Sequence, residues 1–78
     1  MVIGDLVLVT SHFELEHRIF KKSSSVYHSD YSAAREGQLL LVIGAKLDRY
    51  IVQPTDSDQT FFCLRWHLDT YTKIVSNA

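Results

Sequence analysis

The chain has 78 residues, which is enough for one small domain and a modest hydrophobic core. It carries 8 Lys and Arg residues against 9 Asp and Glu residues, so its net charge of −1 excludes an overall basic field for holding nucleic acid. Hydrophobic residues make up 46% of the chain and charged residues 22%, proportions that exclude general disorder.

The first half of the chain predicts one buried strand followed by a long hairpin. Residues 5–10 are rich in leucine and valine and too short for a stable helix, so they predict a strand. Residues 12–20 alternate in character: one strand face carries Phe13, Leu15, His17 and Ile19, and the other carries Glu14, Glu16, Arg18 and Phe20. The polar segment 21–25 predicts a loop tip, and residues 26–31 predict a return strand. A single helical turn over residues 29–35 is the alternative for that last segment.

The second half predicts three further strands with short connections and a closing strand. Residues 38–43 form an apolar run that ends at Gly44, and residues 49–53 form a strand that ends before Pro54, which cannot donate to a sheet ladder. The segment 55–59 has the composition of a hairpin turn, and it is followed by a strand over residues 60–65. Residues 66–69 predict one helical turn, and residues 70–75 predict the closing strand.

Four segments carry a resemblance to a known family: Gly4-Asp5 before the first strand, Gly37 to Gly44, Tyr50-Ile51-Val52, and Trp66-His67-Leu68-Asp69. In their order they resemble the Src-homology-3-like β-barrel family, including its KOW-type relatives in transcription and translation proteins. The resemblance implies a mainly β fold: a small five- or six-stranded barrel with a long hairpin excursion after the first strand and one short helical turn before the last. The acidic-and-aromatic pattern by which Src-homology-3 domains bind proline-rich peptides is missing, which argues against that activity.

No spacing in the sequence predicts a catalytic or metal site. Serine-nucleophile, His-Glu-x-x-His and Cys-x-x-Cys patterns are absent, and the glycines flank no phosphate-binding pattern. Glu14 and Glu16 share a strand face about 7 Å apart, which is compatible with acid–base chemistry but is typical of a solvated strand face. Cys63 is expected to be a buried apolar residue. We therefore expect a non-enzymatic protein without a metal or small-molecule cofactor.

The hairpin carries the candidate contact residues. Aromatic residues make up 12% of the chain, more than a core this small can bury, and surface aromatics are typical anchors for a protein partner. Basic and aromatic side chains come together near the predicted loop tip, where we expect the partner-binding residues to be Arg18, Phe20, Lys21, Lys22, Tyr27 and Tyr31. Phe20 is the sharpest case, because it shares its strand face with charged residues.

These features predict a small module that binds another protein as an adaptor, inhibitor or accessory subunit of a larger assembly. The alternative is a KOW-like contact with nucleic acid or a ribonucleoprotein through the basic residues Arg18, Lys21, Lys22, Arg35 and Arg49. The single cysteine and the absence of a leader or membrane segment favour a cytoplasmic protein without membrane contact. Such proteins are common in the compact genomes of bacteriophages, so a viral accessory role is included in this expectation. We expect residues 1–78 to form one domain from which residues 12–35 project.

Overall fold

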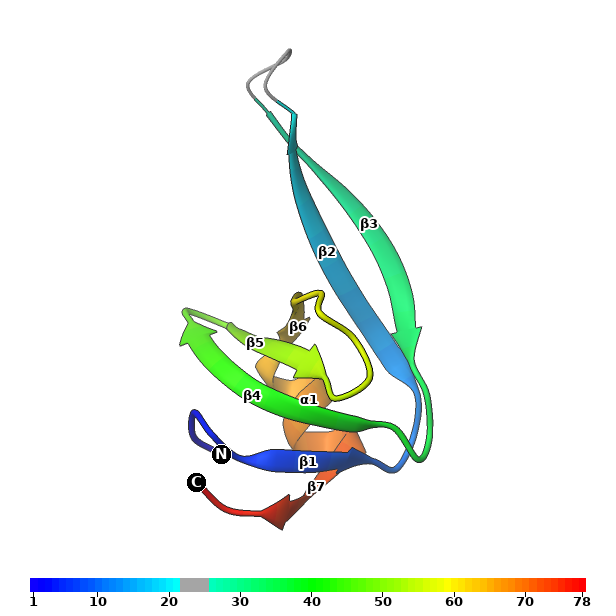
Figure 1. Ribbon diagram of the computed structural model, residues 1–78, viewed down its shortest axis with the longest axis vertical. Coiled ribbons are helices and arrows are strands. Elements are labelled where there is room, and N and C mark those ends of the chain that lie inside the picture. The colour runs from blue at the N-terminus through cyan, green and yellow to red at the C-terminus, as the bar shows by residue number, and fades with distance from the viewer. Residues whose placement is uncertain (22–25) are drawn as a thin grey trace.

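The structure is a computed structural model that describes the backbone of residues 1–21 and 26–78 and the side chains of residues 1–18 and 29–78. In chain order the elements are β1 (Leu6–Val9), β2 (Phe13–Lys21), β3 (Val26–Ala34), β4 (Leu39–Lys46), β5 (Arg49–Pro54), β6 (Phe61–Leu64), α1 (Arg65–Tyr71) and β7 (Thr72–Ser76). The prediction of a mainly β domain with one short helix before the last strand is confirmed (Figure 1).

The seven strands of the described residues form one antiparallel sheet in the order β3-β2-β6-β5-β4-β1-β7. Strands β3 and β7 are its edges, so the hydrogen-bonded ladder does not close into a barrel. This corrects the expected count of five or six barrel strands. Both hairpin strands join the sheet, because β2 pairs with β6 at Glu16 and Phe62 while β3 continues the sheet beyond β2.

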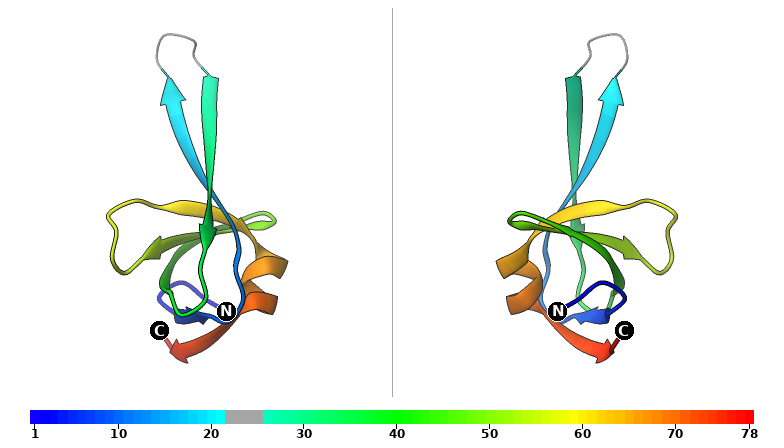
Figure 2. Two further views of the ribbon diagram at one scale, coloured as in Figure 1. Left: turned by 90° about the vertical axis from the view of Figure 1, so that its right-hand side faces the viewer. Right: turned by 90° about the vertical axis from the view of Figure 1, so that its left-hand side faces the viewer.

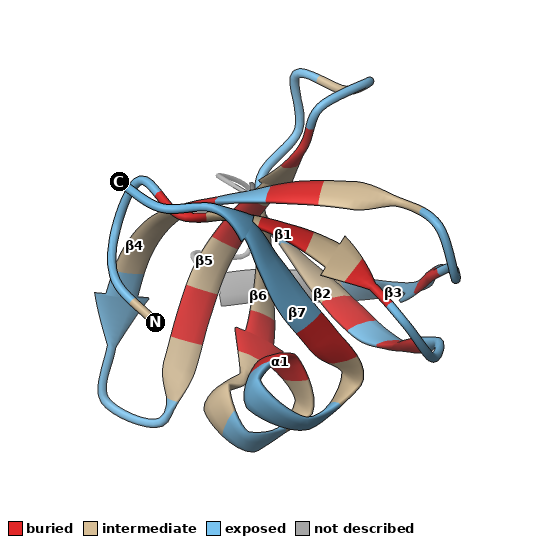
Figure 3. Ribbon diagram, turned by 90° about the horizontal axis from the view of Figure 1, so that it is seen from below, coloured by how far each residue is buried: buried red, intermediate tan, exposed pale blue. Residues whose placement is uncertain are grey.

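The inner face of the curled sheet holds the core, and α1 packs against β5, β6 and β7 (Figure 3). Alternation along the strands decides which side chains enter it. Val7 and Val9 are buried on β1, whereas Leu6 and Leu8 lie on the outer face and remain partly exposed. Phe13 and Leu15 are buried on β2, which confirms the predicted strand register in the described part of the hairpin.

Three local predictions need correction. Gly44 does not end its strand: β4 continues to Lys46 with a register shift between Val42 and Gly44, which identifies the glycine as part of a β-bulge. The chain reverses instead at Leu47-Asp48, after the last pair of the ladder, Lys46 and Arg49. The helix is also longer than the predicted turn over residues 66–69, because it extends from Arg65 to Tyr71. The predicted return strand over residues 26–31 is confirmed and extends to Ala34, so the alternative of a helical turn over residues 29–35 is wrong.

Strands β2 and β3 form an arm that projects from the rest of the domain (Figures 1 and 2). The two strands pair with each other from Phe13–Ala34 to Lys21–Val26. In the described residues, β2 pairs with a third strand only at Glu16. The arm gives the molecule principal extents of 41 × 22 × 21 Å. The predicted projection is therefore confirmed for the described part of the hairpin beyond Glu16, whereas Phe13, Leu15 and Ala34 at its base belong to the core of the body.

Candidate binding surface

Glu16 organises the outer face at the base of the arm. Its Oε1 accepts a hydrogen bond from Arg18 Nε at 2.8 Å, and its Oε2 accepts one from the Tyr31 hydroxyl at 3.2 Å. Partial burial raises the pKa of Glu16, but the hydrogen bond and charge of Arg18 and the hydrogen bonds from Tyr31 and Ser29 outweigh this effect and hold the pKa below its usual value. Glu16 is therefore an anion that positions two of the predicted contact residues.

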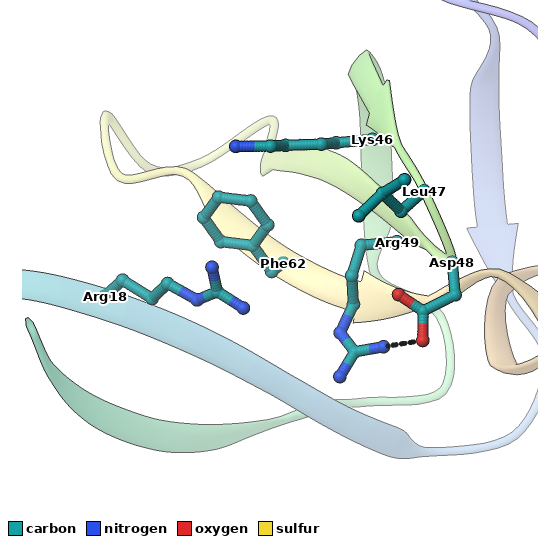
Figure 4. Close-up of a pocket in the computed structure, with 6 residues that line it drawn as sticks. All are labelled: Arg18, Lys46, Leu47, Asp48, Arg49 and Phe62. Carbon is teal, nitrogen blue, oxygen red and sulfur yellow. Dashed lines mark hydrogen bonds and ion pairs between the residues drawn. The ribbon is translucent and has the colours of Figure 1, made fainter.

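The Arg18 guanidinium lies over the ring of Phe62, with its central carbon 4.4 Å from the ring centroid. Phe62 stands on the outer face because Phe61, its neighbour on β6, points inward and packs against the core. Around this pair is a hollow of about 120 Å³ (Figure 4), which we call the Phe62 hollow; it is lined by Arg18, Lys46, Leu47, Asp48, Arg49 and Phe62.

The Phe62 hollow is predominantly cationic. Its basic side chains come from β2, β4 and β5, and Figure 4 shows them around the Phe62 ring. Arg49 forms an ion pair with Asp48, whose Oδ2 lies 2.6 Å from its Nη1. No ion pair of Lys46 is found among the described residues. Glu16 pairs with Arg18 and Asp48 pairs with Arg49, so the charge of Lys46 is the one left without an ion pair among the described residues of the hollow. This net positive charge suits the hollow to one additional negative group.

A second hollow of about 110 Å³ shares Arg49 and Phe62 with the first and includes Glu14, Cys63 and His67 in its lining. Burial raises the pKa of the Cys63 thiol to about 12, and the negative charge of Asp69 acts in the same direction, whereas the charge of Arg49 and a backbone hydrogen bond with Tyr50 oppose the shift. The thiol is therefore protonated at neutral pH and is a poor nucleophile. In the part of the chain that the structure describes, no group of three metal-binding side chains comes together.

A separate group of aromatic rings lies where α1 meets the start of β2. Trp66 is 56% exposed, and its ring centroid is 4.1 Å from that of His67 and 6.1 Å from that of Tyr71. Phe13, at the start of β2, contacts the same group, with ring-centroid distances of 6.1 Å to His67 and 6.2 Å to Tyr71. The exposed aromatic surface expected from the composition is therefore present, although Trp66 was not among the predicted contact residues.

The structure brings together two of the six predicted contact residues. Arg18 and Tyr31 meet at Glu16, and Tyr31 is 59% exposed. The side chains of Phe20, Lys21 and Tyr27, and the whole of Lys22, lie outside the described residues, although Phe20 and Tyr27 are paired through their backbones.

Sequence reasoning missed four lining residues of the Phe62 hollow, namely Lys46, Leu47, Asp48 and Phe62. The available signal was Leu47, an apolar residue followed by Asp48 in the turn between two strands. Such a position in a tight hairpin turn usually holds glycine or asparagine.

Comparisons of the chain with protein families, with curated proteins and with solved structures give no match. Among the described elements there is no helix with the length and apolar character required to cross a membrane. The function is therefore inferred from the arrangement of the residues themselves.

Proposed function

We propose that this protein is a non-enzymatic binding module that contacts another protein through the β2–β3 arm and the outer sheet face at its base. It would act as an adaptor, inhibitor or accessory subunit of a larger assembly. The observation that carries the proposal is the arm itself: beyond Glu16, its two strands pair only with each other in the described residues.

A two-stranded ribbon of this kind is only marginally stable in water and contributes little to a core. An ordered excursion much longer than an ordinary hairpin loop is usually functional. The arm also offers a partner an unpaired edge along β3 and the exposed ring of Tyr31. Edge strands and exposed tyrosines are both common elements of protein interfaces.

The chemistry of the two hollows supports a non-enzymatic role. The Cys63 thiol is protonated at neutral pH, and Glu16 is an ion already engaged by Arg18 and Tyr31. A carboxylate with a lowered pKa is a poor general acid at neutral pH. We therefore do not propose acid–base chemistry at the Glu14–Glu16 pair.

A KOW-like contact with nucleic acid is the second candidate, and the three cations of the Phe62 hollow favour it. We place it second because Glu14, Glu16 and Asp48 lie beside those cations and oppose an extended polyanion. The resemblance to Src-homology-3-like barrels remains a prediction, as does a cytoplasmic location.

The test compares the protein with a variant in which residues 19–28 are replaced by Asn-Gly, a turn that continues the ladder from the Arg18–Ser29 pair. Tagged protein is incubated with extract of the cells that produce it, and bound proteins are quantified. We expect one stoichiometric partner, retained by the exposed-face control Lys73→Gln and lost by the shortened arm. Circular dichroism verifies that both variants are folded. Absence of a stoichiometric partner, or its retention by the shortened arm, would contradict the proposal.

A further inference from the structure

Leu47 occupies a position that stability alone disfavours. Its φ of 54° lies in the left-handed region, where a side chain other than that of glycine or asparagine is strained. The leucine side chain is 86% exposed, so it gains almost no burial in return. Among the described residues it is the only non-glycine residue with a positive φ. Strained residues that serve no packing role concentrate at functional sites.

Leu47 lines the Phe62 hollow, so its strained backbone conformation places an apolar side chain at a candidate binding surface. The tight turn Leu47-Asp48 directs an apolar side chain to the rim, while the strand ends on either side supply Lys46 and Arg49 (Figure 4). The surface therefore combines an exposed aliphatic group, an aromatic ring and three cations within one small region.

The electrostatics of the hollow indicate one kind of group. Glu16 holds Arg18 at Nε, and the guanidinium is placed over the Phe62 ring, so its remaining N–H groups are oriented in advance. Lys46 adds a charge that is not paired within the described residues. A hollow of about 120 Å³ accommodates a single anionic group. A long polyanion would also meet Glu14 and Glu16, and the whole chain carries a net charge of −1.

We propose that the Phe62 hollow is the docking site for an acidic, apolar peptide segment of the partner protein. One Asp or Glu carboxylate binds between Lys46 and Arg18, and a neighbouring apolar side chain packs on Leu47 and the edge of Phe62. This inference rests on the proposed protein-binding function and specifies the chemistry of the partner.

The probe is a synthetic peptide, acetyl-Gly-Ser-Leu-Glu-Leu-Glu-Phe-Ser-Gly-amide, titrated into the ¹⁵N-labelled protein and followed by NMR. We expect saturable shifts of the amides of Leu47, Arg49 and Phe62. A peptide with Gln in place of Glu should bind at least 5-fold more weakly, because it lacks the carboxylates. Shifts confined to other surfaces, or equal affinity for the Gln peptide, would overturn the inference.

Leu47→Gly separates binding from stability. Glycine relieves the strained φ, so the thermal midpoint should stay the same or rise, whereas peptide affinity should fall at least 5-fold. Lys46→Gln should also weaken binding, and Lys73→Gln on β7 is the control that should leave it unchanged. Wild-type affinity in Leu47→Gly would show that Leu47 does not contribute to binding, and a lowered thermal midpoint would show that its role is structural; either result contradicts the inference.

Two further experiments identify the chemical class of the anionic ligand and distinguish a failure of this inference from a failure of the proposed function. Inorganic phosphate and a single-stranded oligonucleotide are titrated separately; oligonucleotide shifts at the Phe62 hollow without peptide shifts would overturn the inference in favour of nucleic acid. If Leu47→Gly still captures the partner from extract while the shortened arm does not, the proposed function stands and this inference fails.

Discussion

Asp5 shows how one side chain joins distant parts of the chain. It is only 2% exposed, and its carboxylate accepts hydrogen bonds from the backbone N–H of Val2 at 2.9 Å and of Ala78 at 3.0 Å. Those two hydrogen bonds lower its pKa from the ordinary value of 3.8, against the effect of burial. Gly4, immediately before it, has a φ of 99°, and a Cβ there would lie 2.8 Å from that of Ala78. The Gly-Asp pair therefore holds the two ends of the described chain together.

Asp5 makes stability depend on pH in the acid range. Because its pKa is lower in the folded state than in the unfolded state, the unfolded state binds more protons in this window, and stability rises with pH. This stabilisation by Asp5 is complete above about pH 3.8, the ordinary pKa of the group, and it is lost as the pH falls through the folded-state pKa. We expect Asp5→Asn to lower the urea midpoint at pH 7, with the difference from wild type shrinking in acid. Urea titrations from pH 7 to pH 2.5 measure this; a difference independent of pH would contradict it.

Residue patterns predicted the facing of side chains well, but not the composition of the Phe62 hollow. Phe13, Leu15 and Cys63 are buried as predicted, because a strand alternates its faces with a period of two. Lys46 and Phe62 are 16 positions apart and meet only because β4, β5 and β6 are neighbours in the sheet. A local sequence pattern does not specify which strands are neighbours in the sheet. The sequence therefore indicated the arm but not the surface at its base.

At the scale of elements, α1 depends on its packing and not on its own sequence. It has seven residues, and its first turn lacks both a side-chain cap and an acidic residue. A helix of this length is unstable in isolation. Its one buried residue is Leu68, which is fully enclosed in the core. Since β6 and β7 flank α1 directly in the chain, displacing Leu68 should disturb the anchoring of both strands.

Two substitutions on this helix test that dependence. Leu68→Ala removes a fully buried side chain and should lower the free energy of unfolding by about 2–5 kcal/mol. Trp66→Ala removes a larger but mainly exposed side chain from the same helix and should cost less than Leu68→Ala. Thermal and urea unfolding of both variants measure the difference. A larger loss in Trp66→Ala would show that the exposed aromatic group, and not the core contact, holds the helix.

At the scale of the whole molecule, the order of elements along the chain was predicted correctly, whereas the predicted closure of the sheet into a barrel is wrong. Closure depends on strand tilt and stagger, which alternation does not encode. Here the ladder ends at β7 on one side and at β3 on the other, and β3 belongs to the projecting arm. An edge that extends away from the body along β2 cannot also pair with β7. The projecting hairpin and the open sheet are therefore two consequences of the same arrangement.

This arrangement predicts that stability is unequal along the long axis. The body buries Val7, Val42 and Val52 completely, whereas in the described residues the backbone of the arm beyond the Glu16–Phe62 pair is paired with its own partner strand only. Amide hydrogen exchange at those three valines should require global unfolding, because their strands lie inside the sheet. Exchange in the outer arm should occur by local opening and be at least 100-fold faster, since an isolated ribbon is only marginally stable.

Amide exchange followed by NMR at increasing urea distinguishes the two regimes, because global opening accelerates with urea and local opening hardly changes. The variant with residues 19–28 replaced by Asn-Gly is the matched control, and its body amides should exchange within a few-fold of the wild-type rates. Arm amides as protected as Val42, or a body that loses protection when the arm is shortened, would mean that the arm is part of the cooperative core. The arm would then owe its length to stability, and the proposed contact surface would lose its main support.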